Sequence, residues 1–140
     1  MAIIILIAIQ FIPVTYTNPP IISEPNWDTP ETRSLTERAC FDCHSNETAL
    51  PWYSTIAPVS WLIYNDISEG RDEINFSEWK LKSKKAEHLK DEIKEVISEG
   101  EMPPWYYLPM HPTAKLTADE KKILIEGLQQ TVSNSITEVD

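Results

Sequence analysis

The 140-residue sequence predicts a small all-α domain. Apolar residues recur with the i, i+3, i+4 spacing of a helix in several separate segments. The eleven prolines lie in three stretches, residues 13–30, 51–58 and 103–112, and these stretches separate the helical segments. No run of residues alternates between polar and apolar side chains, as a half-exposed strand does, so we expect no sheet.

The first two helices have recognisable ends. One is predicted over Glu31–Cys43, with Thr29 as its N-cap and Pro30 at the first helical position. The second is predicted from the apolar spacing of residues 59–67, and it should end near Gly70.

Two longer helices follow. One is predicted over residues 77–97 and is ended by Gly100. The last begins with a capping box, Thr117 to Glu120, in which a hydroxyl and a carboxylate bind each other's backbone N–H groups. An apolar stripe over residues 123–132 continues this helix.

The sequence predicts that the chain has three parts. Residues 1–17 are predicted to be an N-terminal membrane anchor or a signal-like segment, residues 18–30 a proline-rich linker, and residues 31–140 the folded domain. The apolar run over residues 1–14 would span only about 21 Å as a helix, against about 30 Å of hydrocarbon. It either starts inside a longer anchor or is a short uncleaved one. A buried core helix is the weaker alternative, because the proline-rich linker would detach it from the domain. The linker has little capacity to form a core of its own; it is either extended or lies across the domain surface with Trp27 as an anchoring aromatic.

The formal net charge of −10 excludes an extended nucleic-acid surface, which needs clustered Lys and Arg. The acidity suits redox protein partners that present basic docking patches, or it simply keeps the domain soluble. The oligomeric state has no sequence signal.

The most informative motif is Cys40-Phe41-Asp42-Cys43-His44, which contains both cysteines of the chain. A C-x-x-C-H sequence is typical of covalent attachment of a c-type haem. Two thiols three positions apart reach the two vinyl groups of one haem, and the adjacent His44 binds the iron as the proximal ligand. The alternatives are a thioredoxin-like redox pair, half of a zinc site, or a strained disulfide. The first lacks a preceding strand, and the second lacks further ligands.

The distal iron ligand has three candidates in the segment 100–112. Met102 lies 58 positions after His44 in a Met-Pro-Pro sequence just before the last helix, and we predict that it is the ligand. Met110 and His111 are the alternatives. The prolines would hold this segment extended and remove backbone donors.

The pocket is expected to be aromatic. Trp52, Tyr53, Trp61 and Trp105 are predicted to line the haem and to exclude water. Arg71 is predicted to bind a haem propionate, since that charge needs compensation in an acidic protein.

From Asn18 to about Leu128 the chain resembles the small bacterial haem-binding domain family with a single C-x-x-C-H site. The resemblance rests on a series of short motifs in order along the chain: Cys40–Ser45, Pro51–Tyr53, Ile56–Leu62, Glu69–Arg71, Asn75–Trp79, Glu101–Pro103 and His111–Leu116. It implies thioether attachment through both cysteines, one covalent haem c, an N-terminal membrane anchor, and no settled choice between Met102 and His111.

These observations together predict a small domain like a class I cytochrome c around one covalently bound haem. The predicted function is one-electron transfer on the periplasmic side of a bacterial inner membrane, without enzymatic activity. A haem-based gas or redox sensor with a displaceable sixth ligand is the alternative. A peroxidase would need a distal pair such as His with Arg, and His111 has no Arg nearby.

Overall fold

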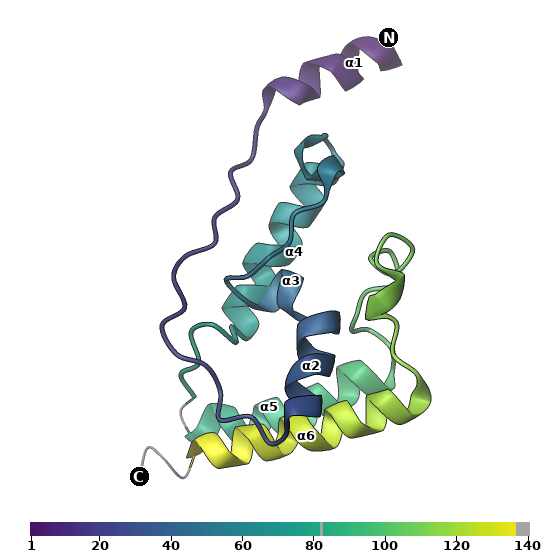
Figure 1. Cartoon of the computed structure of the whole chain (residues 1–140). Coiled ribbons are helices and arrows are strands. Elements are labelled where there is room, and N and C mark those ends of the chain that lie inside the picture. The colour runs from purple at the N-terminus through teal and green to yellow at the C-terminus, as the bar shows by residue number, and fades with distance from the viewer. Residues whose placement is uncertain (82, 137–140) are drawn as a thin grey trace.

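The computed structural model describes residues 1–81 and 83–136, without the side chains of residues 83 and 84. Its elements are helices joined by loops (Figure 1): α1 (Ala2–Ala8), η1 (Ile9–Phe11), α2 (Pro30–Ala39), α3 (Phe41–His44), η2 (Trp52–Thr55), α4 (Val59–Glu73), α5 (Ser83–Ser98), η3 (Pro112–Ala114) and α6 (Ala118–Ile136). In this described part there is no strand, only one isolated bridge between Ser23 and Glu78. The predicted all-α fold is confirmed.

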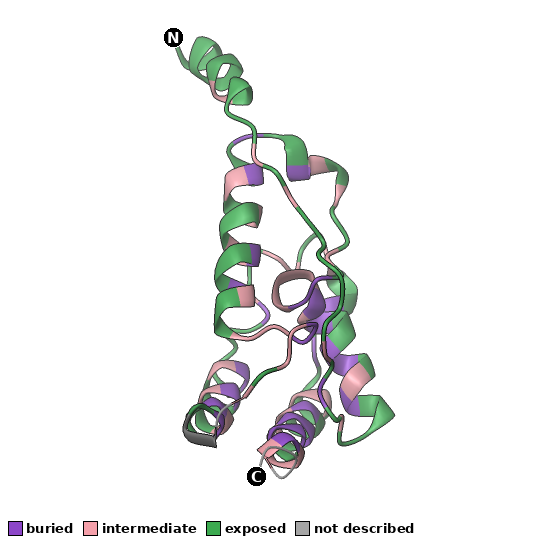
Figure 2. Ribbon diagram, turned by 90° about the vertical axis from the view of Figure 1, so that its left-hand side faces the viewer, coloured by how far each residue is buried: buried purple, intermediate pink, exposed green. Residues whose placement is uncertain are grey.

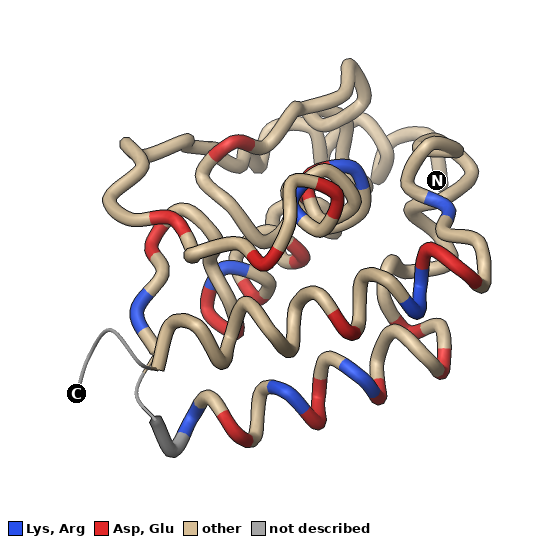
Figure 3. The backbone as a smooth tube through the Cα atoms, turned by 60° about the horizontal axis from the view of Figure 1, so that its bottom comes forward, with Lys and Arg blue, Asp and Glu red and all other residues tan. Residues whose placement is uncertain are grey.

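The core lies where α5 and α6 pair and α2 packs on them. Buried side chains such as Leu89 and Ile93 of α5 meet Leu124 and Val132 of α6, and Leu35 of α2 joins the same cluster. Burial is concentrated at this end of the molecule, whereas α1 at the opposite end is exposed (Figure 2). Lysines and acidic residues alternate along α5 (Figure 3), which fits a helix with one face in the core and the other in water.

The contact between α2 and α6 is close because Gly127 has no side chain. A Cβ at this position would lie 2.1 Å from Oγ1 of Thr32, a residue that is itself buried. The first and last helices of the folded domain therefore cross with their backbones near each other.

A stack of aromatic rings joins α3 to this core. Phe76 lies 5.6 Å from Phe41 and 5.7 Å from Trp79 between ring centroids, and Trp27 lies 5.4 Å from Phe76. Trp27 thus anchors the segment before α2, as predicted. The ring of Phe41 fixes the turn between the two cysteines against the core.

The structure contains both helix caps that the sequence predicted, at the starts of α2 and α6. Thr29 accepts a hydrogen bond from the backbone N–H of Thr32 at 3.1 Å, with Pro30 at the first helical position. In α6, Thr117 accepts from the N–H of Glu120 at 3.2 Å, and Glu120 accepts from the N–H of Thr117 at 2.8 Å. This reciprocal pair is the predicted capping box.

Helix boundaries differ from the prediction at three places. The first predicted helix breaks at Cys40, where the backbone leaves helical geometry at φ −127°, and α3 begins as a separate turn. The helix α4 continues three residues beyond Gly70. The helix α5 begins at residue 83 rather than 77, because Ser77 accepts from the N–H of Ile22 and Trp79 donates to Ser23, which holds this stretch extended.

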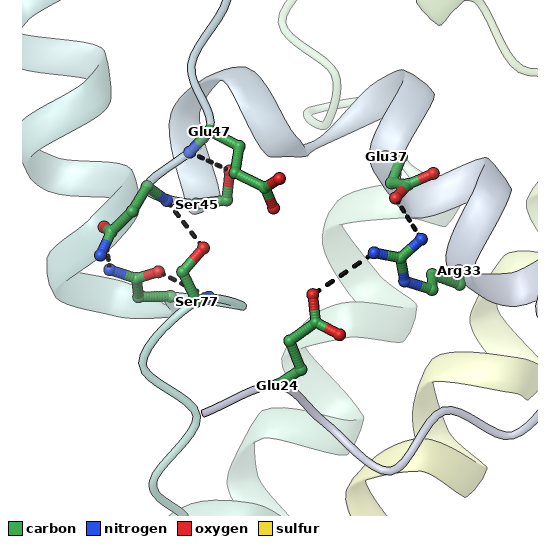
Figure 4. Close-up of polar contacts among 8 residues, drawn as sticks. Glu24, Arg33, Glu37, Ser45, Glu47 and Ser77 are labelled. Atoms are coloured by element: carbon green, nitrogen blue, oxygen red, sulfur yellow. Dashed lines mark hydrogen bonds and ion pairs between the residues drawn. The ribbon is translucent and has the colours of Figure 1, made fainter. Parts of the chain in front are cut away.

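The strap (residues 9–29) runs from α1 along α4 to the start of α2 (Figure 1). Gln10 exchanges two hydrogen bonds with the backbone of Ala57, at 2.9 and 3.0 Å. Trp61 donates from its indole to the carbonyl of Ile12 at 3.1 Å. Figure 4 shows Glu24, near the end of the strap, paired with Arg33 of α2.

The predicted N-terminal membrane anchor over residues 1–17 is wrong. The helix α1 contains seven residues, which corresponds to a rise of about 10 Å against about 30 Å of hydrocarbon. None of the helices in the described ranges is long and apolar enough to span a bilayer. The backbone after Gln10 is bonded to the domain instead of leaving it, as the contacts of Gln10 and Trp61 show.

Candidate haem-binding site

The Cys40–His44 motif forms a single tight turn at the centre of the molecule. The N–H groups of Cys43 and His44 both donate to the carbonyl of Cys40, at 3.2 and 2.9 Å. Both cysteines are free thiols and are half-buried. The turn brings the two thiols and the imidazole to the wall of one cavity.

His44 is oriented by the backbone of α4. Its Nδ1 lies 2.8 Å from the carbonyl oxygen of Gly70 and 3.2 Å from that of Ile74. A carbonyl oxygen can only accept, so Nδ1 carries the proton and Nε2 is left with its lone pair. Burial lowers the pKa of His44 below its usual value, which keeps the ring neutral. A neutral imidazole held in this way is ready to bind a metal through Nε2.

Gly70 allows α4 to approach the motif. A Cβ at this position would lie 2.6 Å from the carbonyl oxygen of Cys43, closer than real Cβ contacts, and 3.1 Å from the Cβ of Cys43. The glycine therefore sets the distance over which His44 bonds to α4.

Three adjoining cavities surround the motif. The first, of about 230 Å³, is lined by Cys40, Cys43, His44 and Met102. A second, of about 130 Å³, shares Cys40, His44 and Met102 and continues towards the core. The third, of about 470 Å³, shares Cys43 with the first and extends along α4. The three cavities together form a mainly apolar space against the thiols and the imidazole.

The end of α5 places Met102 on the walls of two cavities that His44 also lines. Gly100 has φ +78°, and the N–H groups of Gly100 and Glu101 donate to Ile97 and Val96, which is a Schellman motif. The N–H of Met102 donates to Val96 as well, at 3.0 Å. The helix end thus delivers Met102 to the two cavities that contain His44.

The other predicted distal candidates lie elsewhere. Met110 and His111 line the largest of these three cavities, which contains Cys43 but not His44. The ring of His111 stacks on Tyr107 with centroids 3.9 Å apart and an angle of 7° between the planes. Of the three candidates, Met102 is the one that the fold brings to the cavities of the imidazole.

Two of the four aromatic residues that were predicted to line the haem lie on the cavity walls. Trp52 and Tyr53 line the largest cavity. Trp61 is bonded to the strap, and Trp105 is 78% exposed, so neither lies on the walls of the three cavities around the motif.

Arg71, which was predicted to bind a propionate, does not line any of these three cavities. Its guanidinium donates to backbone oxygens of Ser45 and Thr17, both at 2.8 Å, and to side-chain oxygens of Asn18 and Thr48, both at 3.0 Å. Arg71 thus ties the strap to the segment after the motif. Nearby, Ser77 accepts a hydrogen bond from the N–H of Asn46 at 2.9 Å and so holds the same segment (Figure 4).

Acidic residues at the site were not predicted. Asp42, Asp66, Glu69 and Glu73 line the 230 Å³ cavity, whereas among the described residues no Lys or Arg lines any of the three. Burial raises the pKa of Asp66. The sequence could have indicated Asp42, because it lies inside the motif. It gives no local signal for the carboxylates of α4, because only the packing of α4 on α3 brings them to the cavity.

Burial also acts on the two thiols. It raises the pKa of Cys40 to about 12, with a further contribution from Cys43. The pKa of Cys43 is likewise raised to about 12, by burial first and then by the charges of Asp66 and Asp42. Both sulfurs are therefore protonated thiols at neutral pH.

The residues present fit a haem. Two thiols, a neutral imidazole with a free Nε2 and a thioether lie on one apolar space, and these are groups that hold the porphyrin and its iron. In agreement with this geometry, the Haem-binding domain family matches residues 4–130. No curated protein and no solved structure matches the chain significantly. The chain belongs to the haem-binding domain family.

Proposed function

We propose that this protein is a monohaem c-type cytochrome that transfers one electron at a time. In this proposal Cys40 and Cys43 hold one haem covalently, His44 is the proximal ligand and Met102 the distal ligand. The observation that carries the proposal is the shared cavity of these four side chains, with His44 already fixed by its Nδ1 bond to Gly70.

The thiols suit thioether formation. In each attachment the S–H bond adds across a vinyl C=C bond: sulfur bonds to one carbon, the proton ends on the other, and no oxidant or reductant is consumed. The raised pKa values keep both thiols protonated before the reaction. Attachment of this kind takes place outside the cytoplasm, so we place the mature protein on the periplasmic side of the inner membrane.

Two protein ligands on the iron favour an electron carrier over an enzyme. A bound haem supplies reversible one-electron chemistry at its iron. His44 and Met102 would both hold the iron, so that the protein itself would keep a substrate from binding to it. A peroxidase needs a distal acid–base pair, and the cavities described above have no Arg on their walls to partner His111.

Mass and absorption measurements on the mature protein test the proposal. Under denaturing conditions the mass should equal that of the chain plus one haem. The ferric protein should show the weak thioether-to-iron band of a low-spin haem, and the ferrous protein should not bind carbon monoxide. Replacement M102A should abolish the band, whereas the matched replacement M110A should keep it.

Two results would contradict the proposal. A haem that leaves the denatured chain would exclude covalent attachment. A ferrous form that binds carbon monoxide readily in the wild-type protein would favour the sensor, in which the sixth position is open or easily displaced.

A further inference from the structure

We propose that Tyr107 is a positioning residue that holds the distal loop (residues 101–111) closed over the cavity of His44, and so controls how readily Met102 leaves the iron. This inference rests on the proposed function, in which Met102 is the sixth ligand. It adds a residue that makes no contact with the iron and acts through the loop.

The main observation is a short bond between the distal loop and the haem motif. The hydroxyl of Tyr107 donates to Oδ2 of Asp42 at 2.6 Å. Asp42 lies between the two cysteines, so this bond joins the loop directly to the turn that would carry the haem. Bonds to an ionised acceptor are shorter and stronger than neutral ones. Burial and the bond to Asp42 raise the pKa of Tyr107, which keeps its hydroxyl a donor.

The position of Tyr107 in the loop makes this bond effective. The loop is fixed at its start by the N–H of Met102, which donates to Val96 at the end of α5. Only four residues separate Met102 from Tyr107, and two of them, Pro103 and Pro104, restrict the backbone. Met102 is therefore held between its own bond to α5 and the bond of Tyr107 to the haem motif, and Tyr106 adds a longer bond of 3.3 Å to Asp66 of α4.

Tyr107 also holds the competing histidine. His111 stacks on the ring of Tyr107 at 3.9 Å, and its Nδ1 lies 3.1 Å from the carbonyl oxygen of Tyr107. Both contacts keep His111 at the largest cavity, away from the cavities of His44. A phenylalanine at position 107 would retain the stack and the backbone contact, so Y107F removes the bond to Asp42 alone.

The experiment measures how often the distal position opens. Imidazole binds to the ferric iron only after Met102 has left, so its apparent affinity rises with the fraction of open protein. Loss of a hydrogen bond to a charged acceptor should increase that fraction by about tenfold. We therefore expect Y107F to bind imidazole about tenfold more tightly than the wild-type protein, as followed by the haem absorption spectrum.

A matched control separates this effect from a general loss of stability. Tyr16 also uses its hydroxyl in short bonds, 2.9 and 2.6 Å from the carbonyl oxygens of Ser54 and Ser60, but it lies on the strap. Urea unfolding should show that Y16F and Y107F both lose stability. Y16F should bind imidazole with wild-type affinity.

Repeating the Y107F replacement in the M102A variant tests whether Tyr107 acts through Met102. In M102A the sixth position is already open, so M102A and the double variant M102A/Y107F should bind imidazole equally well. If the double variant still binds more tightly, Tyr107 does not act on Met102 and the inference is overturned. Equal affinities of Y107F and Y16F would overturn it as well.

The failure of the inference differs from the failure of the proposed function. If the wild-type protein has no thioether-to-iron band, the proposed ligand is wrong, whatever Y107F does. If the band is present and Y107F leaves the affinity for imidazole unchanged, only the role of Tyr107 is wrong. Should Y107F fail to fold, D42N removes the charge of the acceptor and should raise the affinity in the same direction; an unchanged affinity in D42N would refute the role.

Discussion

Replacement of Gly70 by alanine is the most direct test of how α4 holds the haem motif. The new Cβ would lie 2.6 Å from the carbonyl oxygen of Cys43, and ordinary contact begins at 3.4 Å, so the helix must move by about 0.8 Å. The oxygen is a backbone atom and cannot swing aside. The same movement would lengthen the 2.8 Å bond from Nδ1 of His44 to Gly70 to about 3.6 Å, which no longer counts as a hydrogen bond.

The size of the effect follows from three contributions. Alanine is favoured over glycine inside a helix by about 1 kcal/mol. Against this, forced movement in a packed region costs about 1–3 kcal/mol, and the lost bond about 1 kcal/mol more. We expect G70A to lower the free energy of unfolding by about 2 kcal/mol, measured by urea unfolding with circular dichroism. The reduction potential should rise, because His44 becomes a weaker donor to the iron.

Gly127 offers the matched control. A Cβ at this position would lie 2.1 Å from Oγ1 of Thr32, so G127A should also destabilise the fold. It is placed between α2 and α6, away from His44, and its haem spectrum and potential should match those of the wild-type protein. An unfolding free energy of G70A within about 0.5 kcal/mol of the wild-type value would refute the reasoning.

Three further predictions follow. The pKa values of Cys40 and Cys43 are raised to about 12, against about 8.5 in an unfolded chain, so the folded haem-free protein binds more protons between these values. Its free energy of unfolding should be retained below pH 8.5 and fall as the pH rises towards 12, as urea unfolding over a pH series would measure. In the C40S/C43S variant the free energy of unfolding should no longer fall through loss of these protons over this pH range. T117A should lower the unfolding free energy by about 1 kcal/mol through loss of the capping box, and an unchanged value would show that Glu120 caps α6 without it. R71A removes two hydrogen bonds from α4 to the strap, at Thr17 and Asn18, and two to the segment after the motif, so limited proteolysis within the strap should become faster; R71K should show an intermediate rate, and equal rates for all three proteins would contradict the role of Arg71.

Features that depend on neighbouring residues were predictable from the sequence. The caps at Thr29 and Thr117 act over three residues, and the turn of the Cys40–His44 motif is equally local. The placement of Met102 at a cavity that His44 also lines could be anticipated as well, since Gly100 ends α5 and directs the residues that follow it.

Features that depend on distant contacts could not be predicted. The start of α5 is shifted because residues 22 and 23 bond to residues 77 and 79, and no local spacing encodes this pairing. The bonds of the Arg71 guanidinium to Thr17 of the strap and to Ser45 likewise join residues that are far apart in the sequence. The anchor was predicted from hydropathy and from the family resemblance, and neither registers that Gln10 bonds to Ala57.

The histidine that would hold the iron is oriented by main-chain oxygens instead of a carboxylate side chain. A peptide carbonyl is present whichever amino acid occupies a position, so no single exchange of side chains can delete this acceptor. Substitutions at Ile74 should leave the imidazole tautomer intact, and only changes that displace the whole helix, as at Gly70, should alter it. The tautomer of the His44 ring is thus unusually tolerant of mutation, and a change in iron potential that acts through His44 should require a displacement of α4.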